Sequence, residues 1–279
     1  MSNGTMIVKR DGTKEHLNID KIHKVVEHAC LDLAGVSSSQ IEMNANIQFY
    51  DGMSTNEIQE VLVRSANDLI SLDVPNYQYA AARLLSYSVN KMVFGEYNAI
   101  TLQQNIERNI SRNVYDAEIL EKYTEAEIAT LDSYIRHKRD ENFTYAGLRQ
   151  VVDKYLCQDR SSGEIFESPQ FMYMMIAATL FSNYPAETRM HYVRRYYDAT
   201  SLFKVNIPTP VMAGVRTPVR QFASCVLVDA DDTLDSIFAS DMSIGRYTAQ
   251  RAGIGINAGR IRGVNSRIRG GEVAHTGIV

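Results

Sequence analysis

The spacing of apolar residues along the chain changes at Pro208. Before that residue, apolar positions recur mainly at helical spacing; beyond it, short β-rich pieces are separated by proline, glycine and arginine. A helix-rich part followed by a β-rich part predicts a mixed protein, α+β or α/β, rather than an all-helical one. With 279 residues, 45% of them hydrophobic, the chain can bury a substantial core, and its length suggests two domains rather than one.

Composition excludes several classes of protein. The longest apolar segment, from Phe171 to Phe181, has eleven residues, which suits a core helix and falls short of the roughly 20 residues of a membrane span. Because the residues after Met1 also lack the pattern of a secretory signal, we expect a cytoplasmic protein that does not enter membranes. The net charge of −4 argues against general nucleic-acid binding.

The three cysteines are Cys30, Cys157 and Cys225, and no CxxC pair occurs among them. We therefore expect neither a disulfide framework nor a zinc site, and any disulfide would be functional. Cys30 lies beside an apolar helical face and is expected in the core.

Local patterns predict a compact N-terminal unit over residues 1 to 95. A hairpin is expected over residues 6–20 around a turn at Asp11-Gly12, followed by a helix capped by Asn18 or Asp20. Ser54-Thr-Asn-Glu57 has the pattern of a capping box that opens a second helix, and a third is expected from Pro75.

The middle of the chain is expected to be mainly helical. Thr124-Glu-Ala-Glu127 repeats the capping-box pattern, and alternation around a Ser162-Gly163 turn predicts a small hairpin between residues 155 and 166. Beyond Pro208, the apolar run from Cys225 to Val228 predicts a buried strand, and residues 232–250 are expected to form a helix between strands.

Three features could carry chemistry. Cys225 is the best candidate nucleophile, although a cysteine in an apolar run is more often a small core residue. Lysine, arginine, glutamate and asparagine side chains near the predicted N-terminal turns would suit a nucleoside triphosphate, or would simply form a solvated charged surface. No P-loop is present.

The third feature is the glycine- and arginine-rich segment from Arg251 to Gly271. Its glycines would let backbone amides approach a phosphate, which the arginines could neutralise. The alternative is a flexible basic loop. The spacing Gly253-x-Gly255-x-x-x-Gly259 does not fit a dinucleotide-binding fingerprint.

Seven motifs, in order, resemble those of one enzyme family. The chain is similar over its whole length to the N-terminal part of the large, catalytic (alpha) subunit of class I aerobic ribonucleoside-diphosphate reductase, of the enterobacterial and T-even phage type. The motifs are Val8-Lys-Arg-Asp-Gly12 with Asn18-Ile-Asp-Lys-Ile22; Ile47-Gln-Phe-Tyr-Asp-Gly52; Tyr77-Gln-Tyr-Ala-Ala-Ala-Arg83; Phe181-Ser-Asn-Tyr-Pro185; Pro208-Thr-Pro210; Arg220-Gln-Phe-Ala-Ser-Cys225; and Arg251-Ala-Gly-Ile-Gly-Ile-Asn-Ala-Gly-Arg260.

The resemblance implies three domains. They are an ATP cone over residues 1–95, a mainly helical domain over 96–220, and, over 221–279, the first strands of a ten-stranded α/β barrel with its specificity-site loop. An allosteric activity site that senses ATP against dATP is implied at Lys9, Arg10, Glu15, Asn18, Lys21, Thr55 and Lys91. A specificity site, at which a nucleoside or deoxynucleoside triphosphate selects the substrate, is implied at Asp232, Thr233, Leu234, Arg262 and Arg269.

The resemblance also implies a substrate pocket at Thr209, Ser224, Cys225 and Gly253, with Cys225 as one thiol of a redox pair. In this chemistry a thiyl radical takes the 3′ hydrogen of a ribonucleoside diphosphate, the 2′ hydroxyl leaves as water, and two thiols become a disulfide. The radical cysteine, the second redox thiol, the acid-base groups and the C-terminal thiols would map beyond Val279.

The implied partners are the C-terminal portion of the large subunit, a small subunit with a diiron-tyrosyl radical, a second large subunit, and a thioredoxin- or glutaredoxin-type reductant. No metal is expected in this chain. Because a barrel cut after its first strands would leave unpaired edges, we expect either a truncated chain or an enzyme naturally divided into two polypeptides, and the closing residues favour division.

Two residues depart from close relatives, which have histidines where this chain has Gln59 and Ser88. We therefore expect that nucleotide binding survives while inhibition by dATP is weakened or lost. Two rival interpretations stay open: a non-catalytic regulator that uses only the ATP cone, and a non-functional remnant of an interrupted gene.

Overall fold

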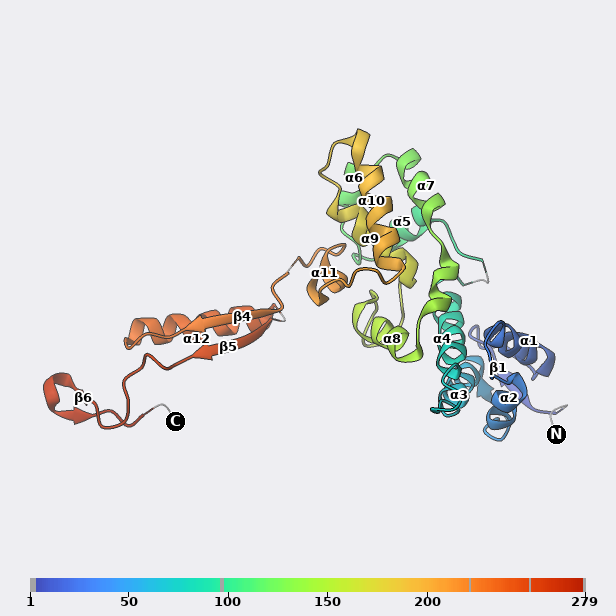
Figure 1. Ribbon diagram of the computed structural model, residues 1–279, viewed down its shortest axis with the longest axis horizontal. Coiled ribbons are helices and arrows are strands. Elements are labelled where there is room, and N and C mark those ends of the chain that lie inside the picture. The colour runs from blue at the N-terminus through green and yellow to red at the C-terminus, as the bar shows by residue number, and fades with distance from the viewer. Residues whose placement is uncertain (1–3, 96–97, 221, 251, 278–279) are drawn as a thin grey trace. The chain divides into compact units, whose positions relative to one another are not determined.

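The computed structural model describes residues 4–95, 98–220, 222–250 and 252–277 (Figure 1). Gln221 and Arg251, which belong to two of the seven motifs, lie outside these ranges. The chain forms two compact units. One comprises Met1–Ile207 with Arg216–Pro218, and the other comprises Pro208–Val215 with Val219–Val279.

A small sheet begins the first unit. β1 (Met6–Val8) pairs with β2 (Lys14–His16) in an antiparallel hairpin, and its other edge pairs in parallel with β3 (Met53–Ser54). Gly12 lies in the hairpin turn with a φ of 81°, a conformation that glycine adopts without strain. The expected hairpin forms, but it ends at His16 rather than at residue 20, because Ile19 already begins the first helix.

Four helices pack beside this sheet: α1 (Ile19–Cys30), α2 (Ser38–Asn46), α3 (Thr55–Asn67) and α4 (Tyr77–Phe94). Asn18 caps α1, and Ser54 and Glu57 form the predicted capping box of α3. Both predictions are confirmed because caps depend on residues close in sequence. Cys30, at the end of α1, is only partly buried, so the expectation of a core position is met only in part.

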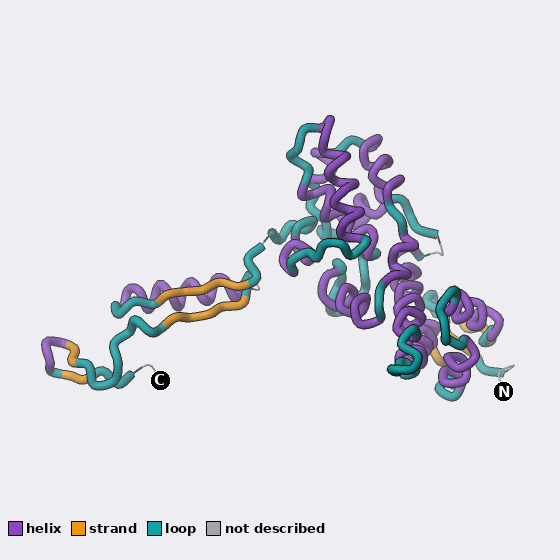
Figure 2. The backbone as a smooth tube through the Cα atoms, in the orientation of Figure 1, coloured by secondary structure: helices purple, strands orange, loops and turns teal. Residues whose placement is uncertain are grey.

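The rest of the first unit is helical (Figure 2). Its elements are α5 (Leu102–Ser111), α6 (Glu118–Lys122), α7 (Glu125–Tyr134), η1 (His137–Asn142), α8 (Tyr145–Gln150), η2 (Val151–Tyr155), α9 (Pro169–Leu180) and α10 (Ala186–Ser201). α9 is the predicted core helix, buried over nearly its whole length. The small hairpin expected before it is reduced to one bridge, between Gln158 and Ile165.

The second unit contains α11 (Thr209–Gly214) and a β-α-β arrangement of β4 (Cys225–Asp229), α12 (Leu234–Ala249) and β5 (Gly253–Asn257). β4 and β5 pair in parallel, with Cys225 opposite Gly253. A short hairpin follows, formed by β6 (Arg267–Ile268), η3 (Arg269–Gly271) and β7 (Val273–Ala274). The helix expected over residues 232–250 is thereby confirmed.

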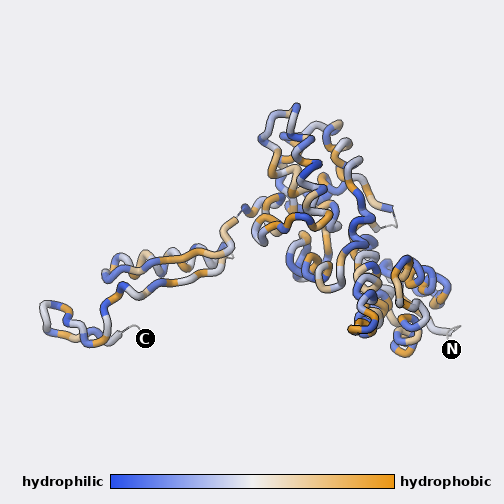
Figure 3. Tube along the Cα trace, viewed as in Figure 1, coloured by the Kyte–Doolittle hydropathy of each residue, from blue (hydrophilic) through white to orange (hydrophobic). Residues whose placement is uncertain are grey.

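The prediction of a buried strand at Cys225–Val228 is wrong in one respect. The strand forms and is largely apolar (Figure 3), but Cys225 is exposed and the side chain of Leu227 is 89% exposed. The reason is that the sheet has two strands in the described residues and α12 packs against them, so one face of β4 has no covering element. Among the residues described, no helix has the length and apolarity needed to span a bilayer.

Candidate functional site

A cluster of charged side chains surrounds the β1–β2 hairpin. Lys9 follows β1, and its Nζ lies 2.7 Å from Oε2 of Glu15 on β2. Nζ of Lys21, in the first turn of α1, lies 3.6 Å from the other carboxylate oxygen of Glu15. The hydrogen bond to Glu15 raises the pKa of Lys9, and the same contact lowers the pKa of Glu15. One carboxylate therefore holds two lysines in place.

Arg10 connects this cluster to the start of α3. Its Nε donates to Oδ1 of Asn56 at 2.7 Å, and Asn56 directly follows Thr55, the first residue of the capped helix. Asn18 lies at the start of α1, where its Oδ1 accepts from the backbone N–H of Lys21 at 3.1 Å. Two helix N-termini thus lie among the charged side chains, and helix N-termini attract anions.

Lys91, on α4, completes the cluster. Burial lowers the pKa of Lys91, and the neighbouring cations Arg10, Lys21 and Lys9 lower it further, whereas Glu15 acts in the opposite direction. These electrostatic effects place Lys9, Arg10, Glu15, Lys21 and Lys91 in one region. Four cations lie together there beside the carboxylates of Glu15 and Asp11, and a bound polyanion would relieve the mutual repulsion of the cations.

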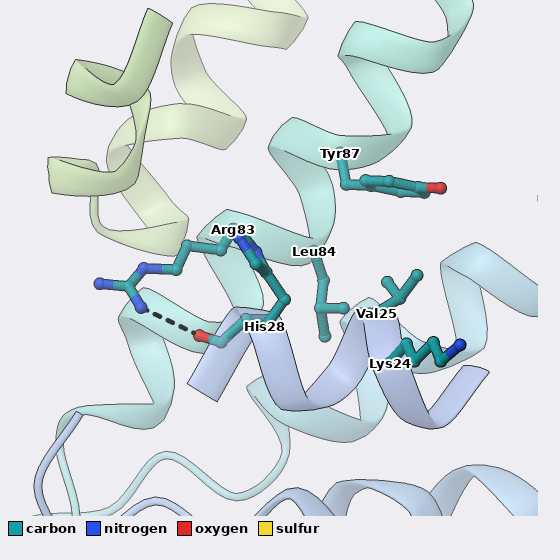
Figure 4. Close-up of a pocket in the computed structure, with 7 residues that line it drawn as sticks. Lys24, Val25, His28, Arg83, Leu84 and Tyr87 are labelled. Atoms are coloured by element: carbon teal, nitrogen blue, oxygen red, sulfur yellow. Dashed lines mark hydrogen bonds between the residues drawn. The ribbon is translucent and has the colours of Figure 1, made fainter. Parts of the chain in front are cut away.

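A pocket of about 220 Å³ lies between α1 and α4 (Figure 4). Its apolar surface is supplied by Val25, Ala29 and Leu84, and Tyr87 projects over it from α4. The remaining lining residues are Lys24, His28 and Arg83. Tyr87 interacts electrostatically with Arg10, so the pocket adjoins the cationic cluster. Several of these residues are spaced i, i+4 within α1 or within α4, and this spacing was a signal in the sequence that did not lead to a predicted pocket.

The predicted specificity-site residues lie around the start of α12. Asp232 accepts from Nε of Arg262 at 2.8 and 2.9 Å and from its backbone N–H at 3.1 Å. This contact lowers the pKa of Asp232 and raises that of Arg262. Thr233 caps α12 through the backbone N–H of Ser236, 3.1 Å away. The structure therefore brings Asp232, Thr233 and Arg262 together.

The other two predicted specificity residues occupy different surroundings. The side chain of Leu234 is 70% exposed at the first turn of α12. Arg269 lies in η3, inside the β6–β7 hairpin, with a positive φ of 50°.

Three of the predicted substrate-pocket residues are adjacent. The backbone N–H of Gly253 donates to the carbonyl oxygen of Ser224 at 2.8 Å, beside the Cys225–Gly253 strand pair. A Cβ added to Gly253 would lie 3.8 Å from Sγ of Cys225, so glycine keeps the backbone next to the thiol open. Thr209, the fourth residue, is exposed at the first position of α11.

Comparison with known proteins identifies the domains of this chain. The ATP cone domain family matches residues 5–92, the ribonucleotide reductase all-alpha domain family matches 141–220, and the ribonucleotide reductase barrel domain family matches 223–279. The chain is 51% identical, over all of its length, to the ribonucleoside-diphosphate reductase 1 subunit alpha of Salmonella typhimurium, and 50% identical to that of Escherichia coli.

The chain belongs to the family of ribonucleotide reductase large subunits. It corresponds to the N-terminal portion of a class I subunit of the enterobacterial type. It spans 37% of the length of the Salmonella and Escherichia relatives, and 36% of the alpha subunit of bacteriophage T4, to which it is 42% identical over 275 residues. The fold class is thereby confirmed as an ATP cone, an all-helical domain and the start of a barrel domain.

One buried ion pair in this chain had no signal in the sequence. Glu167 and Arg216 form an ion pair whose side chains are both fully buried. Glu167 also accepts from the phenol of Tyr115 at 2.5 Å and from the backbone N–H of Cys157 at 2.7 Å. Because the two charges are 49 residues apart, no local pattern connects them.

Proposed function

We propose that this chain contributes nucleotide control and part of the catalytic pocket to a ribonucleoside-diphosphate reductase. The overall reaction would replace the 2′ hydroxyl of a ribonucleoside diphosphate by hydrogen. Two cysteine thiols would supply two electrons and two protons, so that the products are a 2′-deoxyribonucleoside diphosphate, water and one disulfide. The observation that carries this proposal is the exposed thiol of Cys225 beside the open backbone of Gly253.

Cys225 would be one sulfur of the redox pair, with Thr209, Ser224 and Gly253 lining the substrate pocket. A thiyl radical that takes the 3′ hydrogen and a second redox thiol would come from the remaining part of a full-length large subunit. A small subunit with a diiron-tyrosyl radical would generate the thiyl radical. The assembly would include a second large subunit and a thioredoxin- or glutaredoxin-type reductant, in the cytoplasm.

The cluster of Lys9, Arg10, Glu15, Lys21 and Lys91 would be the activity site for ATP and dATP. The four cations suit a triphosphate, and they lie near two helix N-termini. Asn18 and Thr55 would complete it. We keep the domain limits at residues 1–95, 96–220 and 221–279 as part of the proposal.

A second regulatory site would form around Asp232, Thr233, Leu234, Arg262 and Arg269. In the structure, Arg262 is neutralised by Asp232. A triphosphate would compete with this carboxylate for the guanidinium group, whose planar donors suit phosphate oxygens.

Inhibition by dATP would be weak or absent. Nε2 of Gln59 donates to the backbone carbonyl of Leu84 at 2.8 Å, and this contact ties the side chain to α4. A side chain engaged in this way is less available to sense a nucleotide, which supports the hypothesis drawn from Gln59 and Ser88. Strong dATP inhibition of the assembled enzyme would contradict it.

Calorimetric titration of the chain with ATP tests the activity site. Lys91→Met should weaken ATP binding about 10- to 100-fold, the effect of losing one charge-assisted phosphate contact. Lys122→Met is the matched control, because Lys122, the last residue of α6, contacts Glu118 and Asn183 and does not belong to the cluster. Equal affinities for the two variants would refute the assignment of Lys91.

A further inference from the structure

The chain between Thr209 and Cys225 is fixed at one buried point. Arg216 belongs to the first compact unit, whereas the stretches on either side, Pro208–Val215 and the chain from Val219 onward, belong to the second. Thr209 precedes Arg216 by seven residues, and Cys225 follows it by nine. Arg216 therefore lies midway between two stretches that carry proposed substrate-pocket residues.

Both the side chain and the backbone of Arg216 are held. Its Nε donates to the two carboxylate oxygens of Glu167 at 3.1 and 2.8 Å, and its Nη2 donates both to Glu167 and, at 2.9 Å, to the carbonyl oxygen of Tyr155. Its own carbonyl oxygen accepts from the backbone N–H of Asp116 at 3.0 Å. Five hydrogen bonds thus fix the position and direction of the chain at this residue.

Glu167 is fixed independently of Arg216. The Tyr115 phenol and the Cys157 backbone N–H both donate to it, and Nδ2 of Asn105 on α5 donates to the Tyr115 oxygen at 3.2 Å. These contacts hold the Glu167 carboxylate in place without any contribution from Arg216. Rigid supporting contacts of this kind hold functional segments in a productive geometry.

Stability alone is a poor explanation for this pair. A buried ion pair is often no more stable than well-packed apolar side chains of the same volume, because both charges lose their hydration. The better-attested advantage of such a pair is that it specifies one arrangement of the chain. The guanidinium group of Arg216 is planar and the Glu167 carboxylate is held in place. The pair therefore allows little variation in the direction of the Arg216 side chain.

We propose that Arg216 and Glu167 are positioning residues that fix the chain between Thr209 and Cys225 for substrate binding. This role rests on the proposed reductase function, because it takes Thr209 and Cys225 as pocket residues. Arg216 and Glu167 themselves touch neither substrate nor thiol in this role. They act through the backbone on both sides of Arg216.

Two variants separate positioning from stability. Arg216→Lys keeps the buried charge but loses the planar fork, whereas the double variant Glu167→Leu with Arg216→Met removes both charges together. Arg189→Lys is the matched control. Arg189 is also nearly buried and makes a two-nitrogen contact with Glu127, at 2.5 and 3.0 Å, but it belongs to α10 and is not part of the 208–224 stretch.

The first measurement is amide hydrogen exchange of the 279-residue chain, read on peptides covering 208–215 and 219–224. Both Arg216 variants should speed exchange there by about tenfold or more, because the local free energy of opening falls, whereas Arg189→Lys should leave these peptides unchanged. This exchange measurement does not require catalytic activity. Unchanged exchange in both Arg216 variants would overturn the proposal.

The second measurement is steady-state kinetics of the chain assembled as a complete reductase. kcat/KM for a ribonucleoside diphosphate should fall on the order of 100-fold in the Arg216 variants, while ATP affinity stays at the wild-type value. Faster exchange with unchanged kcat/KM would also overturn the positioning role. If the wild-type assembly shows no reduction at all, the proposed function fails, and the exchange measurement still decides whether Arg216 holds this stretch.

Discussion

Asp140 should make the helical part of the chain less stable as pH rises from acid to neutral. Its side chain is buried in η1, where Oδ1 accepts from Nε2 of Gln170 at 2.7 Å and Oδ2 has no partner among the described residues. Burial raises the pKa of Asp140 from 3.8 to about 7, with a further contribution from Glu141. The folded protein therefore favours the neutral carboxylic acid.

The direction of the effect follows from proton binding. Between these two pKa values the unfolded chain binds fewer protons at Asp140 than the folded chain does, so the contribution of this residue to stability falls as pH rises from about 4 to about 7. The full cost above pH 7 is about 4 kcal/mol, from roughly three pKa units at about 1.4 kcal/mol each. At pH 5 the cost is about 1.7 kcal/mol on the same basis.

Asp140→Asn removes this titration while preserving the shape of the side chain. Urea denaturation followed by circular dichroism at pH 5 and pH 8 would give the free energy of unfolding of both proteins. The variant should gain about 2–3 kcal/mol relative to wild type between the two pH values. An unpaired amide at this position adds a cost that does not change with pH, so the comparison across pH isolates the carboxyl group.

Asp159→Asn is the control. Hydrogen bonds from Ser161 lower the pKa of Asp159 from 3.8, so the stability that its carboxylate contributes is lost only at pH values below the assay range, and the difference between Asp159→Asn and wild type should stay constant from pH 5 to pH 8. A difference between Asp140→Asn and wild type that stays constant from pH 5 to pH 8 would refute the reasoning about burial.

Three further predictions concern the proposed sites. Ser54→Ala should lower the free energy of unfolding by about 1 kcal/mol in urea denaturation through loss of the α3 cap, and should weaken ATP binding because Thr55 and Asn56 lie in the same turn; unchanged ATP affinity would show that this turn does not contact the nucleotide. Cys225→Ser should leave ATP binding intact and abolish sustained turnover of the assembled enzyme, whereas Cys30→Ser should retain turnover; normal multiple-turnover rates in Cys225→Ser would exclude the redox role. Glu15→Gln should lower the pKa of Lys9, whose hydrogen bond to Glu15 now raises it, and an unchanged lysine titration by NMR would contradict that cause.

The parts of the fold that were predictable from sequence depend on neighbouring residues. The capping boxes at Ser54 and Thr124 each satisfy backbone donors within one turn, so the four-residue pattern suffices to place a helix start. The apolar run beginning at Phe171 gave a core helix for the same reason, because nothing distant was needed to recognise it. The hairpin of β1 and β2 was predictable from the turn that joins its two strands.

The features that escaped prediction depend on distant partners. The parallel pairing of β1 with β3 joins Ile7 to Met53, and neither residue carries a local sign of the other. The exposure of Cys225 likewise depends on which strands and helices cover β4, which the apolar run itself does not specify.

The candidate sites divide in the same way. Individual residues of the proposed activity site were predicted through resemblance, but the structure was needed to show that Lys91 shares one region with the hairpin cations. The pocket around Tyr87 and the buried pair of Glu167 and Arg216 arise only when separate helices and loops meet.

Co-expression of this chain with a polypeptide that supplies the rest of the large subunit, followed by assay with the small subunit, tests the central claim most directly. The reductase account predicts a stable complex that converts ribonucleoside diphosphates to deoxyribonucleoside diphosphates and responds to ATP. A non-catalytic regulator would bind ATP without turnover, and a non-functional remnant would neither assemble nor turn over. A stable complex that binds ATP but forms no deoxyribonucleotide would contradict the account.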